Sequence, residues 1–149
     1  MNISNKVLLI CTVFNRPKEL KETIHCIEEV VSNRTDTVCV LIDNNSKDKE
    51  AINLLKNIKN ENILIIRRKE NHGKAMASNQ FISEFLSKTN CPRVVISLDP
   101  DIKFQNESFD KLIFALDTIP KLGMLGMRYK NNKYNPERNI IFPAKQFKV

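Results

Sequence analysis

The chain alternates short apolar runs with longer amphipathic segments, and this alternation limits the folds open to it. Four runs rich in Val, Ile and Leu have the length and β-branched content of buried strands, at residues 6–13, 37–42, 62–67 and 94–98. Between these runs, apolar side chains recur at helical spacing. Strands that alternate with helices predict a mainly parallel sheet with helices on its faces. We therefore expect an α/β fold of three layers, α/β/α, of the Rossmann-like kind.

The chain is expected to form one domain. Its 149 residues are enough for a substantial core, and no repeat, low-complexity segment or linker divides them. We expect a single domain over residues 1–149, in which residues 130–149 form a weakly structured tail. Short strands are expected at 123–127 and 140–142.

Local signals place the ends of the helices. Pro17 is well placed as the first residue of a helix after the first strand. Asp48 is expected in the first turn of the next helix, where an acid suits the helix dipole. Asn106 or Ser108 is expected to cap the helix that follows the fourth strand. Asn79 is expected on the inward face of its helix, where a buried amide needs hydrogen-bond partners.

The composition of the chain argues against several classes of protein. No apolar run approaches the ~20 residues of a membrane span, and the polar start of the chain does not match a signal peptide, so we expect a cytoplasmic protein. The four cysteines show no zinc-type spacing with either histidine and are interpreted as free, mostly buried thiols. The net charge of +7 favours anionic partners. Nucleic acid is not expected, because no arginine-rich block with interleaved aromatics occurs.

Each expected strand is followed by a polar loop. In a doubly wound sheet, the loops at the carboxyl ends of the strands share one edge, where ligands usually bind. The convergence of four polar loops on one edge is more informative than any single loop. These loops are residues 12–16, 43–48, 67–74 and 99–101.

The loop after the fourth strand carries two acids, in the sequence Asp99-Pro100-Asp101. Pro100 lacks an N–H, so strand pairing should stop there. Side chains two apart on an extended chain point to the same side, so both carboxylates could bind one ligand. Oxygen ligands of this kind favour Mg²⁺ or Mn²⁺ with a polyphosphate. The alternative is a pair of acids that only stabilise a turn.

Two further residues have both a functional and a structural interpretation. Asp43 could accept a hydrogen bond from a base or a ribose hydroxyl, or it could form a turn. Lys74 precedes a helix whose N-terminus attracts anions, so it could bind a phosphate, or it could be a solvated surface lysine. The residues alone leave these alternatives open.

Taken together and in this order, the four loops resemble those of the family 2 glycosyltransferases of the GT-A fold. The resemblance extends over residues 6–128. The stretches that carry it are Thr12-Val13-Phe14-Asn15-Arg16, Ile42-Asp43-Asn44-Asn45-Ser46-Lys47-Asp48, Asn71-His72-Gly73-Lys74-Ala75 and Leu98-Asp99-Pro100-Asp101-Ile102.

The resemblance implies a GT-A-like fold with a nucleotide-sugar site. On this basis Thr12, Asn15 and Arg16 line the nucleotide pocket. Asp43 contacts the base, and Lys74 lies near the base or the phosphate. The donor expected is a UDP-, dTDP- or GDP-sugar, and its acceptor is unknown.

The same resemblance implies that Asp99 approaches the ribose or sugar and that Asp101 holds Mg²⁺ or Mn²⁺ on the diphosphate. A glycosyltransferase reaction follows from this. The later part of the family, which binds the acceptor and supplies a general base, is expected to be missing, so no catalytic residue is assigned. The alternative function is a non-catalytic nucleotide-sugar-binding module, or a truncated half that needs a partner chain. Oligomer formation and contact with a membrane surface stay open.

Overall fold

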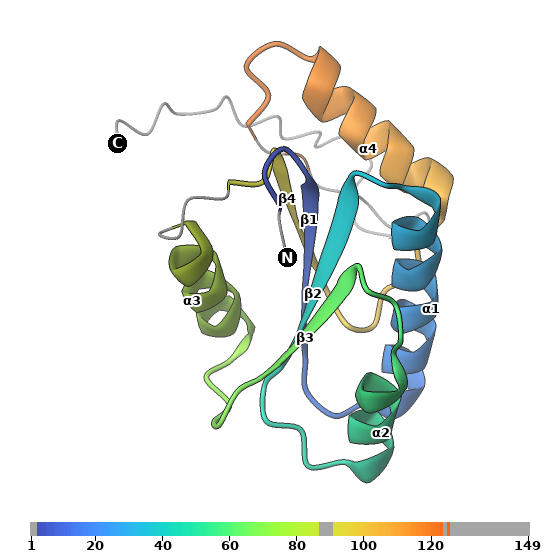
Figure 1. Ribbon diagram of the computed structural model, residues 1–149, viewed down its shortest axis with the longest axis vertical. Coiled ribbons are helices and arrows are strands. Elements are labelled where there is room, and N and C mark those ends of the chain that lie inside the picture. Colours follow the sequence, from blue (N-terminus) through green and yellow to red (C-terminus); the bar gives the residue numbers. More distant parts are fainter. Residues whose placement is uncertain (1–2, 87–90, 124, 126–149) are drawn as a thin grey trace, which may run out of the picture. The chain divides into compact units, whose positions relative to one another are not determined.

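The computed structural model describes residues 3–86, 91–123 and 125, and its contacts divide the chain into two compact units, Met1–Phe104 and Gln105–Val149. The prediction of a single domain stays a prediction. In chain order the elements are β1 (Val7–Val13), α1 (Pro17–Asn33), β2 (Thr37–Asp43), α2 (Lys49–Asn57), β3 (Ile63–Arg67), α3 (Lys74–Leu86), β4 (Val94–Leu98) and α4 (Asn106–Thr118) (Figure 1).

The four strands form one parallel sheet in the order β3-β2-β1-β4. Val7 of β1 pairs with Thr37 of β2 on one side and with Val94 of β4 on the other. Every residue of β1 and β2 is buried, as expected for central strands that are covered on both faces. The edge strands β3 and β4 are shorter and only partly buried. The predicted α/β fold with a mainly parallel sheet is confirmed.

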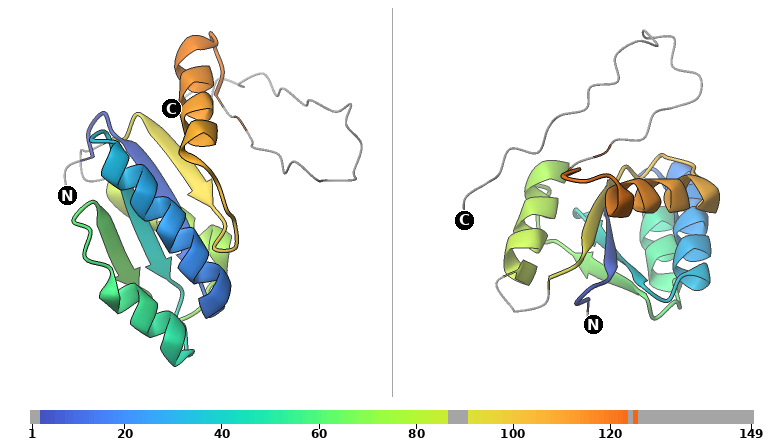
Figure 2. Two further views of the ribbon diagram at one scale, coloured as in Figure 1. Left: turned by 90° about the vertical axis from the view of Figure 1, so that its right-hand side faces the viewer. Right: turned by 90° about the horizontal axis from the view of Figure 1, so that it is seen from above.

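Helices cover both faces of this sheet. Figure 1 and Figure 2 show α1 and α2 on one face and α3 on the other. On the α3 face, Ala77 and Phe81 belong to one buried cluster with the strand residues Leu8, Ile10 and Val40. Full burial of a Leu, Ile or Phe side chain contributes about 1.5–3 kcal/mol, so this cluster fixes α3 against the sheet. One face of α1 is also buried, at Leu20, Ile24, Ile27 and Val31.

The order of the strands creates a switch point between β1 and β4. From β1 the chain moves outward to β2 and then β3, and it returns through α3 to the other side of β1. The connections on the two sides of β1 therefore run over opposite faces of the sheet. Ligands of open α/β sheets usually bind at this place, outside the carboxyl ends of the strands.

The starts of α1 and α2 follow from local chemistry. Pro17 is the first residue of α1, as predicted, where its missing N–H costs nothing. Asp48 acts as the cap of α2 and lies one position before the predicted first turn. Its Oδ1 accepts hydrogen bonds from the N–H groups of Glu50 and Ala51, at 2.8 and 3.0 Å. These bonds satisfy two of the donors that a helix leaves open at its start.

Two predictions about helices are wrong. Asn79 is exposed, because the face of α3 that meets the sheet runs through Phe81, and Asn79 lies around the helix from it. Neither Asn106 nor Ser108 caps α4. The backbone stays extended up to Gln105, so the helix already includes Asn106, and Gln105 makes no side-chain cap hydrogen bond.

Some expectations concern other parts of the chain. Apart from Gly123 and Leu125, the expected strands at 123–127 and 140–142 and the tail at 130–149 lie outside the described residues. Within the described ranges, no helix combines the length and the apolar character needed to cross a bilayer.

Candidate functional site

The carboxyl ends of the strands bring the four polar loops to one edge of the sheet. Val13 pairs in register with Asp43, and Asp43 with Arg67, so β1, β2 and β3 end level with one another. The last residue of β4, Leu98, lies opposite Cys11 of β1. We call this edge the carboxyl rim, which comprises residues 12–16, 43–48, 67–74 and 99–101.

The loop after β1 forms a turn with unusual backbone angles. Asn15 and Arg16 have positive φ angles of 56° and 54°, a left-handed conformation that Asn tolerates better than most residues. The loop after β2 holds this turn in place. The Asn15 N–H donates to Ser46 Oγ at 2.9 Å, and Asn15 Oδ1 accepts from the N–H groups of Lys47 and Asp48 at 2.8 and 3.0 Å. Arg16 therefore projects from a backbone that its neighbouring loop fixes.

Asp43 is almost fully buried and organises the loop after β2. Only 2% of the residue is exposed. Its Oδ1 accepts the Ser46 N–H at 2.8 Å, and its Oδ2 lies 3.5 Å from Arg67 Nη1. Arg67 Nη2 also donates to the Ser46 carbonyl at 2.9 Å. The structure thus gives Asp43 the turn-forming role, and the half-exposed guanidinium of Arg67 provides the accessible polar surface beside it.

The two carboxylates after β4 pair with two different cations. Lys74 Nζ, from the first residue of α3, lies 2.5 Å from Asp99 Oδ1. Arg16 Nη1, from the residue before α1, lies 3.1 Å from Asp101 Oδ2. The four side chains are 41–64% exposed, so each pair contributes only about 0–1 kcal/mol to stability. Because α1 and α3 cover opposite faces of the sheet, one cation reaches the acidic pair from each face.

Further hydrogen bonds tie the rim together. Thr12 Oγ1 lies 3.0 Å from Ser78 Oγ, and both residues are buried, so this bond links β1 to α3. The Asn44 N–H donates to the Val13 carbonyl at 2.9 Å, and the side-chain amides of Asn44 and Asn71 approach to 2.6 Å. Thr12 therefore supports the site from within the core, whereas the predicted residues Arg16, Lys74, Asp99 and Asp101 are accessible at the rim.

The two buried cysteines do not supply a nucleophile. All four are free, as predicted, but only two are buried: Cys11 and Cys39, with Cys26 half-buried and Cys91 exposed. The pKa of the Cys11 thiol is raised to about 12, mainly by burial. The positive charge of Lys74 lowers this pKa, and the negative charges of Asp99 and Asp101 raise it. Burial also raises the pKa of Cys39 well above its ordinary value. Both thiols stay protonated at neutral pH, and the protonated form is not nucleophilic.

Sequence reasoning missed three residues of the rim. Ser46 is fully buried and bonds both Asp43 and Asn15, and its position three residues after an aspartate is a signal for such a turn. Arg67 was recognised only as part of a polar loop, because its partnership with Asp43 depends on strand register. Phe14 is 42% exposed in the loop after β1, and its ring is accessible at the rim.

The donor atoms of the acidic pair suit a hard divalent cation. Mg²⁺ and Mn²⁺ commonly bind through one or two carboxylates and complete their shell with water and phosphate oxygens. Over the described residues, no place gathers three or more His, Cys, Asp or Glu side chains that could hold a metal ion. The two carboxylates of Asp99 and Asp101 fit an ion whose remaining ligands are water or phosphate oxygens, as in a metal–phosphate complex.

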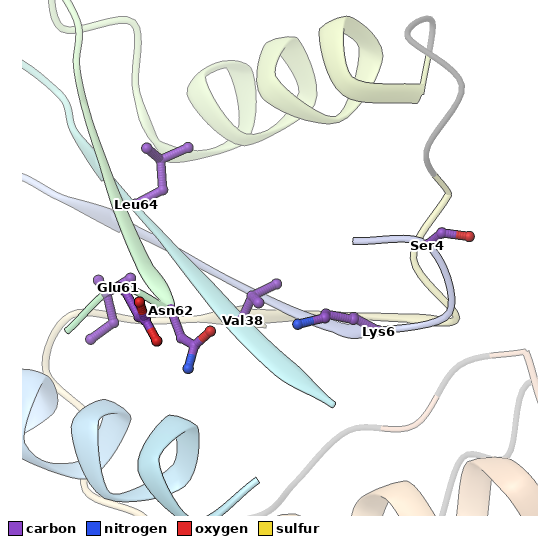
Figure 3. A pocket seen from close by; sticks show the side chains of 7 residues that line it. Ser4, Lys6, Val38, Glu61, Asn62 and Leu64 are labelled. Carbon is purple, nitrogen blue, oxygen red and sulfur yellow. The ribbon is translucent and has the colours of Figure 1, made fainter. Parts of the chain in front are cut away.

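A separate hollow of about 610 Å³ lies at the opposite edge of the sheet, where the strands begin (Figure 3). Its lining includes Lys6, which precedes β1, together with Glu61, Asn62 and the apolar side chains of Val38 and Leu64. None of the predicted site residues borders it. The candidate site is therefore the carboxyl rim and not this hollow.

Comparison with known proteins adds to this picture. The family model described as Glycosyl transferase family 2 matches residues 9–145. Among solved structures, the mannosyltransferase PcManGT from Pyrobaculum calidifontis, in complex with GDP-Man and Mn²⁺, aligns with a TM-score of 0.65 at 19% identity. The alignment covers 80% of this chain and 34% of that chain, so this chain spans about a third of the length of the mannosyltransferase. A search of curated proteins finds no match. The structural likeness identifies the fold as GT-A-like.

Proposed function

Because the chain belongs to glycosyl transferase family 2, we propose that it binds a nucleotide-sugar donor at the carboxyl rim and transfers the sugar with a divalent cation. The observation that carries this proposal is the acidic pair after β4, in which Asp99 and Asp101 each meet a cation at the switch point of the sheet. Two carboxylates beside two cations offer partners both for a metal ion and for a diphosphate.

The acidic pair and its cations form the proposed diphosphate end of the site. Asp101 would hold Mg²⁺ or Mn²⁺, and Asp99 would approach the ribose or the sugar. A bound ion neutralises the charge that develops on the nucleoside diphosphate as the sugar bond breaks. Arg16 and Lys74 would bind phosphoryl oxygens, the first through paired N–H donors and the second as a point charge.

The loops after β1, β2 and β3 form the proposed nucleoside end. Asn15 and Thr12 fix the loop after β1, and the exposed ring of Phe14 offers a flat surface on which a base can stack. Asp43 is buried and would act on the base indirectly: it orients Arg67, whose half-exposed side chain would present hydrogen-bond donors to the base. Thr12, Asn15 and Asp43 thus support the rim loops. Phe14 and Arg67 are the side chains that would contact the base.

The proposed donor is a UDP-, dTDP- or GDP-sugar, and the proposed ion is Mg²⁺ or Mn²⁺. The net charge of +7 favours an anionic donor, and the PcManGT complex with GDP-Man and Mn²⁺, a structure of similar fold, supports the proposed pair. We assign the protein to the cytoplasm, since its four cysteines are free. The acceptor is left unassigned.

A second function is a nucleotide-sugar-binding module without transfer activity, or one that acts with a partner chain. It is favoured because the rim acids Asp99 and Asp101 are each paired with a cation of this chain, and Asp43 and Asp48 accept backbone N–H groups. In the described chain, the acids that follow Asp101 all belong to α4: Glu107, Asp110 and Asp117.

Thermal denaturation with UDP, dTDP and GDP, each with and without Mn²⁺, tests donor binding. A ligand at 100 times its Kd stabilises by about 2.7 kcal/mol, which raises the Tm by roughly 5–10 °C for a chain of this size. Asp101→Asn should remove the Mn²⁺-dependent part of the increase, whereas Glu61→Gln at the opposite edge should leave it unchanged. If none of the three diphosphates shifts the Tm, the proposal is wrong. An assay for the release of nucleoside diphosphate from a nucleotide sugar then distinguishes the two functions. A transferase releases the diphosphate, and a binding module does not.

A further inference from the structure

The four charged side chains at the switch point form a neutral group. Asp99 pairs with Lys74, and Asp101 pairs with Arg16, so two negative charges face two positive charges. The cations come from different segments, since Lys74 begins α3 and Arg16 precedes α1. Each carboxylate that would bind a metal ion therefore already carries a cation that belongs to the protein.

The geometry makes these cations easy to displace without moving the backbone. The turn that carries Arg16 is held by the hydrogen bonds of Asn15 to Ser46, Lys47 and Asp48, whereas the Arg16 side chain itself is 64% exposed. The Lys74 side chain is 43% exposed. Exposed ion pairs are weak, so opening both costs little. A long charged side chain on a fixed backbone can exchange one partner for another nearby.

We propose that Arg16 and Lys74 act as exchangeable counter-ions of the acidic pair, so that the site takes up a divalent cation and a diphosphate together. This inference rests on the proposed function, adds to it the manner of binding, and gives Asp99 a second role as a ligand of the metal ion beside Asp101. When both ligands arrive, the carboxylates of Asp99 and Asp101 pass to the metal ion, and the guanidinium and ammonium groups pass to phosphoryl oxygens. Every charge then has a partner before and after binding.

Either ligand alone breaks this balance. A metal ion without a diphosphate displaces Arg16 and Lys74 from their partners and leaves four positive charges against two carboxylates. A diphosphate without a metal ion draws the cations away and leaves two carboxylates beside the phosphates. Because the diphosphate of a nucleotide sugar carries one negative charge on each phosphoryl group, its complex with a divalent cation is neutral, like the group it enters. A diphosphate also offers one phosphoryl group to each of the two released cations, whereas a monophosphate offers one group for both and a nucleoside offers none. The ligand class is therefore a metal–diphosphate complex.

Mn²⁺ binding to the full chain tests the inference without any measure of activity. The electron paramagnetic resonance signal of free Mn²⁺ gives its Kd alone and in the presence of saturating UDP, dTDP or GDP, with UMP as a monophosphate comparison. In the wild type, the effective diphosphate should lower the Kd of Mn²⁺ at least about tenfold, within the usual range of coupling between two sites. UMP should lower it less.

The variant Arg16→Asn removes the charge and keeps a residue that tolerates a positive φ. Without nucleotide it should bind Mn²⁺ about 2–5-fold more tightly than the wild type, because the competing cation is gone. Its coupling between Mn²⁺ and diphosphate should shrink. Lys74→Gln should behave alike and serves as an independent variant. Lys103→Gln is the matched control, since it removes a positive charge from the loop that carries Asp99 and Asp101 but breaks only the 2.9 Å pair with Glu22.

The outcomes separate the inference from the proposed function. If a diphosphate binds but Arg16→Asn and Lys74→Gln change the Mn²⁺ affinity of the nucleotide-free protein no more than Lys103→Gln does, the counter-ion role is wrong and the donor site stands. The same conclusion follows if Mn²⁺ and diphosphate bind the wild type independently. If no diphosphate binds the wild type, the proposed function fails as well.

Discussion

The side chain of Asn15 should be the main support of the turn that carries Arg16. Asn15→Ala removes the acceptor of two hydrogen bonds, from the N–H groups of Lys47 and Asp48 at 2.8 and 3.0 Å, and each contributes about 0.5–1.5 kcal/mol. It also places a residue with a Cβ and no local hydrogen bond at a φ of 56°, which costs about 1 kcal/mol. The expected loss of unfolding free energy is therefore about 2–4 kcal/mol.

Urea denaturation followed by circular dichroism measures this loss, and thermal denaturation should show a Tm lower by roughly 6–12 °C. Two matched variants separate the contributions. Asn15→Asp keeps an acceptor and a residue that tolerates the left-handed region, so it should stay within about 1 kcal/mol of the wild type. Asn15→Gly relaxes the backbone but loses the acceptor, so it should lose about 1–3 kcal/mol. If Asn15→Ala is no less stable than Asn15→Asp, the side chain does not hold the turn.

Three further predictions concern charge and thiols. Arg67→Ala leaves the buried carboxylate of Asp43 without its cation and should cost about 1–3 kcal/mol in urea denaturation, whereas Arg67→Lys should lose less; equal stability of the alanine variant would contradict the pairing. Burial alone raises the pKa of Asp36, but the hydrogen bond and charge of Arg34 outweigh it and hold this pKa below its ordinary value. The stabilisation that the ionised Asp36 gives to the fold is therefore complete above pH ~4 and is lost as the pH falls further. Asp36→Asn should lower the free energy of unfolding at pH 7, and its free energy of unfolding should converge with that of the wild type at low pH. A difference between the two proteins that does not change with pH would exclude the linkage. Ellman's reagent should label the exposed Cys91 first in the folded protein, and the two fully buried thiols should react only after urea is added; early labelling of either would show that the core is open.

Most of the fold follows from the sequence because the strands are continuous apolar runs. The run 94–98 coincides with β4, and the other three predicted strands differ from the observed ones by a single terminal residue. The inward faces and the ends of the helices were harder to predict from the sequence. Asn79 was placed on the wrong face because the 3.6-residue period fixes a stripe only once its buried members, such as Phe81, are known. The start of α4 moved because the backbone at Gln105 stays extended without a cap.

The rim was predictable as a place but not as a set of contacts. The rule that loops of a doubly wound sheet share one edge was enough to bring residues 12–16 and 99–101 together. The partnership of Arg16 with Asp101 joins residues 85 apart, and that of Lys74 with Asp99 joins residues 25 apart, so no local pattern reveals them. The burial of Asp43 likewise depends on its register with Arg67, a property of the assembled sheet.

The location of ligand binding tests the account most directly. In a ¹H–¹⁵N NMR titration with Mg²⁺ and UDP, dTDP or GDP, the backbone amides of the carboxyl rim should shift, those of Arg16, Lys74 and Asp99 among them. These shifts should be largest when Mg²⁺ and the diphosphate are present together. The account would be contradicted if no diphosphate moved any amide, or if the shifts gathered around Lys6 and Asn62 at the opposite edge of the sheet.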